Sequence, residues 1–498
     1  MAKSERKFGS LAALAGLLLV LGCGSGSGGA GPAGAGGSKA TGGAVGQGGG
    51  NSSATGGSST GIAGGNETGG ATTLTGGTST GGASAAGSGG AKTGGAPGTG
   101  GAASGGASSV GGAKTGGAPG TGGSTSGTSS YACNGTTTGY NTTMIKSGST
   151  WAVTSSGTER YSGADTQAAL TAAYNSLTAG RTTKQSILVQ GDGDIDASAQ
   201  LAIPSYTILN WCGTLNVSGT PSGSDRSPLY ARGKTDIDIP NLHMTGSPQY
   251  GIFFRGTNNM HLGQIDLRLT STAGIGIRVD TSGSAGSDTT FNTNLSIDYV
   301  YGTGMSSHIV ETYGIDNIKI GTVEGNAVGE CGLLFNRSIN ATVNLVTCTN
   351  CGTGTGYAAF RVANSVGKIG TAFPAGNIHV TKVVARGGGR GIFSVSGCGG
   401  LTIDQIDVAN TGNTSILLQN TYNTTIAAVS GTVVGGLVQI SNDTTNTDNG
   451  TYLPSQNVAI KNLVLSGGAA VRQDWCTQFG ANGCTATNVT GGNVAMCP

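Results

Sequence analysis

The feature that most constrains the fold is a short apolar strand that recurs nine times between residues 229 and 438. The nine copies follow one another at intervals of 21 to 33 residues, and each begins with an apolar residue. These first residues are Leu229, Ile252, Ile277, Ile309, Leu333, Ala359, Ile392, Ile416 and Leu437. One copy of this length cannot bury its apolar side chains alone, so each copy must stack against its neighbours. The chain is therefore expected to form a solenoid.

Each copy contains two further apolar segments. In the second segment apolar and polar residues alternate, a pattern typical of a strand with one buried face. It begins at Ile237, Met260, Leu295, Ile318, Ala341, Ile378, Leu401, Thr424 and Val458. The third contributes Leu242, Ile265, Val300, Val323, Val346, Val383, Ile406, Val429 and Leu463. Three short strands and three turns per copy predict an all-β fold, a parallel β-helix that is right-handed by the usual crossover rule. A leucine-rich horseshoe would need a Leu-x-x-Leu-x-Leu pattern, which is absent.

The residue before the second strand is the most regular position of the repeat. Seven of its nine members are Asn, in the series Asp236, Asn259, Asn294, Asn317, Asn340, Asn377, Gly400, Asn423 and Asn457. Asn tolerates the left-handed backbone that a tight corner requires. Stacked Asn side chains can also hydrogen-bond to one another from coil to coil. This column therefore predicts one corner of the β-helix.

The repeats lie within a domain that is expected to span residues 131–498. Its one convincing helix is predicted at about 165–177, with Asp165 as N-cap and Gly180 after its end. This helix is expected to cap the first coil, where unpaired strand edges would otherwise invite aggregation. The coils should cover about 187–465 and a C-terminal cap about 466–498.

Over about residues 160–465 the chain resembles the right-handed parallel β-helix superfamily, which includes pectate lyases, polygalacturonases, chondroitinases and alginate lyases. The resemblance implies a substrate groove along one outer sheet and an extracellular polysaccharide as partner. Polygalacturonases place an Asp-Asp pair before one such strand. This chain contains no Asp-Asp pair, and its corresponding residues are Ser307-His308, Glu330-Cys331 and Gly356-Tyr357. The resemblance therefore does not carry the polygalacturonase mechanism to this chain.

The amino terminus combines basic residues, an apolar run over 11–21 and the sequence Val20-Leu21-Gly22-Cys23. It resembles a bacterial lipoprotein signal, with residues 1–22 as the signal peptide and Cys23 as the lipidated residue. The alternative is an ordinary secretory signal. The resemblance implies an exported protein that is held by outer-membrane lipid through Cys23, as an outer-membrane or cell-surface lipoprotein.

Residues 23–130 are expected to form a disordered Gly-rich linker. Positions 24–130 hold 43 glycines and only four charged residues, Lys39, Glu67, Lys92 and Lys114. Such a composition cannot bury enough apolar area to offset the entropy lost on ordering. At about 5–6 Å times the square root of its length, the linker would hold the domain on the order of 55–60 Å from its anchor.

The charge of the domain argues against a nucleic-acid partner. Residues 131–498 contain 19 Lys and Arg against 21 Asp and Glu, a net charge of 19 − 21 = −2, whereas nucleic-acid binders show a basic excess.

We expect the protein to be a monomer.

The cysteines of an exported domain are free to form disulfides. Cys476 and Cys484 are close enough in sequence to close a small loop, and Cys398 is expected to stay unpaired inside the stack. Cys348 and Cys351 have a zinc or redox spacing, but no second Cys or His pair lies at the matching distance. A structural zinc site is therefore not favoured.

Two columns of polar residues occupy the central coils. The first, at or just before the first strand, is the expected catalytic set: His308, Glu330, Tyr357 and Arg390. The second, within or after that strand, includes Asn336 and the expected substrate-binding residues Arg255, Asp280, Glu311 and Arg361. Neighbouring coils should place the members of a column about 4.8 Å apart, outside the core.

Three functions fit these residues. A polysaccharide lyase, the favoured one, needs a base and a cation to remove a proton beside a carboxylate. His308 or Tyr357 is the expected base, and Arg361, Arg390 or a Ca²⁺ ion near Asp280 and Glu311 is the expected cation. A glycoside hydrolase needs two carboxylates about 5–9.5 Å apart, for which Glu311 and Glu330 are available. The third is a non-catalytic glycan-binding adhesin.

Overall fold

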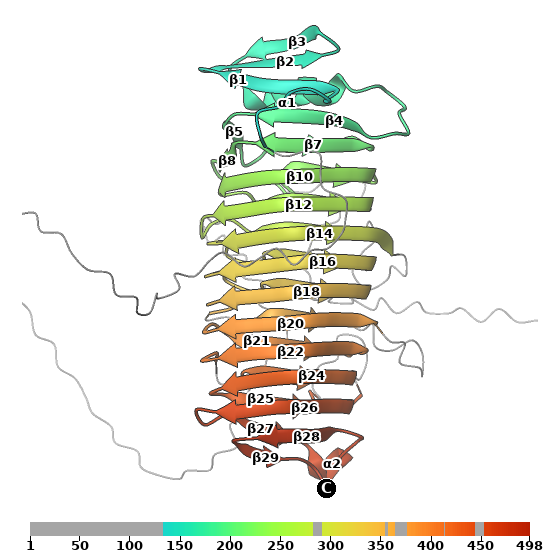
Figure 1. Ribbon diagram of the computed structural model, residues 1–498, viewed down its shortest axis with the longest axis vertical. Helices are drawn as coiled ribbons and strands as arrows, with labels where there is room; N and C mark the ends of the chain where they lie inside the picture. Colours follow the sequence, from blue (N-terminus) through green and yellow to red (C-terminus); the bar gives the residue numbers. More distant parts are fainter. Residues whose placement is uncertain (1–132, 282–290, 354–356, 364–375, 413, 444–452) are drawn as a thin grey trace, which may run out of the picture. The chain divides into compact units, whose positions relative to one another are not determined.

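The computed structural model describes residues 133–281, 291–353, 357–363, 376–412, 414–443 and 453–498. In these residues the predicted fold class is confirmed: strands stack in parallel, coil upon coil, around an apolar core (Figure 1). The predicted signal peptide (1–22), Cys23 and the linker (23–130) lie outside the described residues. Among the described residues, no helix has the length and hydropathy needed to cross a bilayer.

Two parallel sheets form the walls of the β-helix. In sheet A, long strands contain both the second and the third strand predicted for each coil, so that each pair is one continuous strand. These strands are β10 (Thr235–Gly246), β12 (Asn258–Leu269), β14 (Asn292–Thr303), β16 (Ile315–Asn326), β18 (Ile339–Thr349), β20 (Ile378–Arg386), β22 (Leu401–Ala409), β24 (Tyr422–Val434) and β26 (Gln456–Ser466). The shorter strand β28 (Thr485–Thr490) pairs with β26 after them.

Sheet B contains the first strand of each coil. Its twelve strands are β6 (Gln200–Ala202), β9 (Ser227–Arg232), β11 (Tyr250–Arg255), β13 (Ile275–Asp280), β15 (Val310–Tyr313), β17 (Leu333–Asn336), β19 (Ala358–Ala363), β21 (Arg390–Val395), β23 (Ile416–Gln419), β25 (Leu437–Ser441), β27 (Ala470–Gln473) and β29 (Asn493–Ala495). The last strands, β28 and β29, lie beyond residue 465, so the ladders continue into the segment expected to be only a cap.

The N-terminal end of the stack is closed by a small cap. Strands β1 (Thr142–Ser147), β2 (Thr150–Ser155) and β3 (Thr158–Gly163) pair antiparallel, and helix α1 (Thr166–Asn175) packs against them. Asp165 is the N-cap, as predicted, and accepts hydrogen bonds from the backbone of Gln167 and Ala168; the C-cap is Ser176, four residues before Gly180. The remaining elements are β4 (Gln185–Gln190), β5 (Gly193–Asp196), β7 (Thr207–Cys212), β8 (Thr214–Ser218) and a short C-terminal helix, α2 (Cys476–Phe479).

The predicted corner column is confirmed. All nine of its residues have φ between 49° and 71°, in the left-handed region. Asn294 donates to Asn259 Oδ1 at 2.7 Å and accepts from Asn317 Nδ2 at 2.7 Å, so the side-chain amides form a ladder along the stack. The ladder is interrupted at Asn340, which donates instead to Asp316.

The predicted apolar columns are correct for the second strand and need adjustment in the other two. In sheet B the residues that align are Val310, Phe360 and Val438, each one position after the predicted residue. Ile309 and Val310 are both buried in the core, because two consecutive residues point inward where the strand begins. In the third column Val429 is wrong: a bulge puts Gly431 beside Ile406 and leaves Val429 60% exposed.

In the part of the chain that the structure describes, three disulfides join Cys133 to Cys212, Cys348 to Cys351 and Cys476 to Cys497. The predicted loop between Cys476 and Cys484 is therefore wrong, because the partner of Cys476 is brought close by the last coil rather than by sequence proximity. Cys398 is free and buried, as expected, and so are Cys331 and Cys484.

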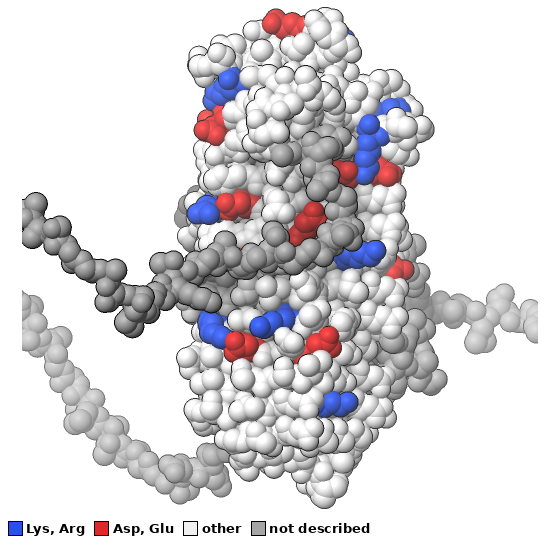
Figure 2. Space-filling view, in the orientation of Figure 1, with Lys and Arg blue, Asp and Glu red and all other residues white. Residues whose placement is uncertain are grey.

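Charged side chains are sparse on the surface of the stack. Figure 2 shows them on one face as isolated residues and opposite-sign neighbours, without a continuous basic stripe.

Candidate active site

The predicted polar residues gather on the outer face of sheet B, but the second predicted column is two columns. Strand pairing aligns Arg255 with Asp280, and separately aligns Arg278 with Glu311. Leu334 then aligns with both Glu311 and Arg361. The second polar column was misaligned for the same reason as the apolar positions of sheet B that are shifted by one residue. Two inward residues at the strand start displace the outward side chains by one position.

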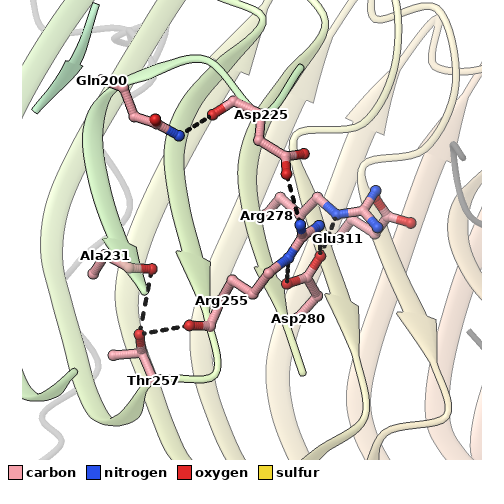
Figure 3. A network of polar contacts seen from close by, with 8 residues as sticks. All are labelled: Gln200, Asp225, Ala231, Arg255, Thr257, Arg278, Asp280 and Glu311. Atoms are coloured by element: carbon pink, nitrogen blue, oxygen red, sulfur yellow. Dashed lines mark hydrogen bonds and ion pairs between the residues drawn. The ribbon is translucent and has the colours of Figure 1, made fainter. Parts of the chain in front are cut away.

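Alternating charges form an ionic network on strands β11, β13 and β15, together with Asp225 just before β9 (Figure 3). Arg255 binds Asp280 through Nε at 2.8 Å and Nη2 at 2.9 Å, and Asp225 through Nη1 at 2.7 Å. Arg278 binds Asp280 through Nε at 3.0 Å and Glu311 through Nη1 at 2.9 Å. Apart from Asp225, these side chains are buried, although they point away from the core. Arg278 and Asp225 were missed in the sequence, where neither belongs to a recognisable motif.

Asp280 and Glu311 do not fit the Ca²⁺ ion that was expected near them. Both oxygens of Asp280 accept hydrogen bonds from guanidinium groups. Glu311 accepts from Arg278 at one oxygen and from Asn336 Nδ2, at 2.9 Å, at the other. Among the described residues, no group of three or more His, Cys, Asp and Glu side chains is arranged to hold a metal ion.

A second set of residues, the Glu330 cluster, comprises Ser307, His308, Glu330, Tyr357, Arg361, Arg390 and Phe393. The hydroxyl of Ser307 donates to Glu330 Oε2, and His308 Nε2 lies 3.1 Å from the same oxygen. Among the described residues no hydrogen bond is made to Oε1 of Glu330. The Glu330 side chain remains 19% exposed, and burial raises its pKa against the opposing effects of Ser307 and Arg361. Glu330 therefore has one constrained oxygen and one available oxygen.

His308 is buried, although a surface position was expected. The residue is only 6% exposed, and its ring packs against Tyr357, with 5.7 Å between the ring centroids. Nδ1 accepts a hydrogen bond from the backbone N–H of Cys331 at 3.1 Å. Burial, together with the charges of Arg361 and Arg278, lowers the pKa of His308 well below its usual value.

Arg361 and Arg390 complete the cluster on two neighbouring strands. The guanidinium of Arg361 lies 4.4 Å from the ring centroid of Tyr357, and both guanidinium groups lie 4.8 Å from that of Phe393. No carboxylate among the described residues forms an ion pair with Arg390, and its Nε is buried without a hydrogen-bond partner. Burial and the charge of Arg361 lower the pKa of Arg390. This arginine is therefore suited to receive an anion from outside the chain.

The structure thus brings all four expected catalytic residues together and adds Arg361 from the other predicted set. The ionic network instead contains Arg255, Asp280 and Glu311. Their charged groups are already hydrogen-bonded to other side chains of the protein. Ser307 and Phe393 were missed. Ser307 directly precedes His308, and Phe393 occupies the outward position aligned with Arg361, so correct strand register would have found the latter.

Comparison with known proteins adds a likeness of fold. No protein-family model and no curated protein matches the chain. Among solved structures it is similar to the A-module of the mannuronan C-5 epimerase AlgE4 of Azotobacter vinelandii, with a TM-score of 0.49 and 12% identity, over 67% of this chain and 92% of that one. The A-module of the epimerase AlgE6 from the same organism gives a TM-score of 0.40 and 12% identity, over 67% and 96%. A likeness this distant carries no information on activity, which must be inferred from the residues of the site.

Proposed function

We propose that this domain is a carbohydrate-active enzyme, a polysaccharide lyase that acts by β-elimination on an acidic extracellular polysaccharide. One observation carries the proposal. Glu330, a carboxyl group whose pKa is raised, lies in the same cluster as Arg390, a half-buried cation without a carboxylate partner among the described residues. A general base works best when its pKa is close to the working pH, and an arginine fork suits a carboxylate.

The reaction begins at the carbon next to the carboxylate of a uronic acid residue. Glu330 Oε1 takes the proton from that carbon, and the electron pair shifts toward the carboxylate, where Arg390 and Arg361 stabilise the developing charge. The pair then forms a carbon–carbon double bond as the neighbouring glycosidic C–O bond breaks. Burial raises the pKa of Tyr357, so its hydroxyl is protonated and donates the proton to the leaving oxygen.

This assignment changes two expectations. The base is Glu330 rather than His308 or Tyr357, because Nδ1 of His308 is occupied by a backbone N–H and the Tyr357 hydroxyl, whose pKa is raised by burial, already carries its proton. A glycoside hydrolase is disfavoured, because both oxygens of Glu311, the second carboxylate it would need, are bound by Arg278 and Asn336.

A panel of acidic and neutral polysaccharides tests the proposal. We expect ultraviolet-absorbing unsaturated uronates to appear with acidic substrates only, because only a uronate provides an acidified proton. Reducing ends without ultraviolet absorption would contradict the proposal in favour of a hydrolase, and binding without products in favour of an adhesin. Inversion at the proton-bearing carbon, followed by NMR in deuterated water, would show that the same proton removal ends in epimerisation instead of cleavage.

We propose further that the domain works while anchored to a lipid surface. The support is the sequence around Cys23 and the Gly-rich linker after it, which together suit a tethered enzyme whose substrate is too large to enter the cell. Cells that express the wild-type chain should incorporate a labelled lipid precursor into it. The Cys23→Ala chain should lose both the label and its membrane association, and a membrane-bound Cys23→Ala chain would disprove the anchor.

A further inference from the structure

The hydrogen bonds of His308 define which of its nitrogens carries a proton. The backbone N–H of Cys331 points at Nδ1, 3.1 Å away. A backbone N–H can only donate, so Nδ1 must be the acceptor and carries no hydrogen. The ring proton of the neutral imidazole therefore lies on Nε2, 3.1 Å from Glu330 Oε2.

We infer that His308 is a neutral positioning residue, which holds Glu330 through its Nε2–H and transfers no proton during the reaction. The inference rests on the proposed role of Glu330 as the base. Ser307 donates a hydrogen bond to Oε2, and the Nε2–H of His308 lies 3.1 Å from the same oxygen, so both groups contact the carboxyl group at one oxygen. Its other oxygen, Oε1, is left for the substrate.

The surroundings of His308 resist its protonation. A second ring proton would have to be placed on Nδ1, which would break the bond from Cys331 and leave that buried N–H without a partner. The titratable and charged groups that face the ring are Glu330, Tyr357, Arg278 and Arg361. Burial of the ring first, and then the charges of the two arginines, oppose a positive charge on the imidazole and lower its pKa.

His379 provides a matched control elsewhere in the chain. Its Nε2 also binds a carboxylate, Asp404, at 2.9 Å, and its side chain is 48% exposed. It lies on β20 in sheet A, away from the Glu330 cluster. The two histidines therefore share an imidazole–carboxylate contact but differ in burial.

NMR of the full chain labelled with ¹⁵N-histidine tests the tautomer without reference to any substrate. The signal that disappears in His308→Gln is assigned to His308, and His379 and His261 serve as references for more exposed rings. We expect the His308 ring to remain in the Nε2–H form between about pH 5 and 8, where an ordinary histidine changes its charge. Protonation of both nitrogens within this range, or a proton on Nδ1, would overturn the inference.

Two conservative variants separate positioning from proton transfer. His308→Gln keeps an N–H that can reach Glu330, whereas His308→Asn keeps only an acceptor for the N–H of Cys331. If His308 positions Glu330, the Gln variant should retain kcat within about tenfold, whereas Asn and Ala should lose about a hundredfold. If His308 transferred a proton, Gln would be as inactive as Ala.

Thermal unfolding identifies any variant that fails to fold, and His379→Gln should match the wild type in activity. If no acidic polysaccharide were converted by the wild-type chain, the proposed function would fail. The NMR result would still decide whether His308 is held as a neutral donor.

Discussion

Replacement of Glu330 by glutamine is expected to lower kcat on an acidic polysaccharide by about a thousandfold, within the range lost with a general base. Glutamine has nearly the same shape and can still accept a hydrogen bond from Ser307, but it cannot take a proton. KM should change little, because the missing interaction acts only in the transition state. The rate of ultraviolet-absorbing product formation measures the effect.

Glu159→Gln, an exposed position on β3, is the control and should be fully active.

The pH dependence of activity and stability supplies a second check on Glu330. Since burial raises the pKa of Glu330, activity should fall as the pH falls through a value above that of an ordinary glutamate. A raised folded-state pKa also means that stability is lost as the pH rises through it. Above that pH Glu330→Gln should therefore be more stable than the wild type, and a variant that is both active and less stable would contradict the assignment.

The second large effect concerns stability and separates Arg278, which is buried, from Arg390, which is half-buried. Arg278→Met is expected to lower the free energy of unfolding by about 3–5 kcal/mol, because it leaves the buried carboxylates of Asp280 and Glu311 without a shared cation. Arg390→Met should leave that free energy unchanged or raise it, because no carboxylate of the described residues pairs with Arg390. Urea unfolding followed by circular dichroism measures both.

Activity should show the opposite order. Arg390→Met is expected to lose about a hundredfold in kcat, as for the loss of one charge-stabilising donor, although its fold is intact. Arg278→Met should retain activity under conditions where it remains folded. Similar losses of stability in the two variants would mean that Arg390 is held by the protein like Arg278 and is not kept for a ligand.

Much of the fold could be predicted because its signals repeat. The Asn column marks a corner at every coil, and the alternating second strand aligns correctly in all nine copies. The exceptions have local causes. Ile309 and Val310 are both apolar and both point inward, so the sequence offered no way to choose between them. Val429 lies in a bulge that the pattern of the repeat does not predict.

The sequence indicated which residues lie in the candidate site, but it did not indicate which hydrogen bonds and ion pairs they make. His308, Glu330, Tyr357 and Arg390 were selected as a set because polar residues coincide at the start of neighbouring strands. Which nitrogen of His308 accepts the backbone hydrogen bond, and that Glu311 pairs with Arg278, depend on the register of the strands and the directions of the side chains. A one-residue shift in register changes both, so periodicity alone could not settle them.

The coil-by-coil construction of sheet B also has a consequence for how such a site evolves. Glu330 is placed just before β17, whereas Arg361 and Arg390 belong to the next two strands, β19 and β21. Duplication of a single coil between them would move Glu330, the proposed base, away from the two arginines by one strand spacing, about 4.8 Å. Proton removal and stabilisation of the resulting charge could then no longer take place on the same sugar residue. Insertions into the turns between coils leave that spacing unchanged. In the proposed mechanism, the number of coils between Glu330 and the two arginines must therefore stay constant, whereas the turns between coils are free to vary in length.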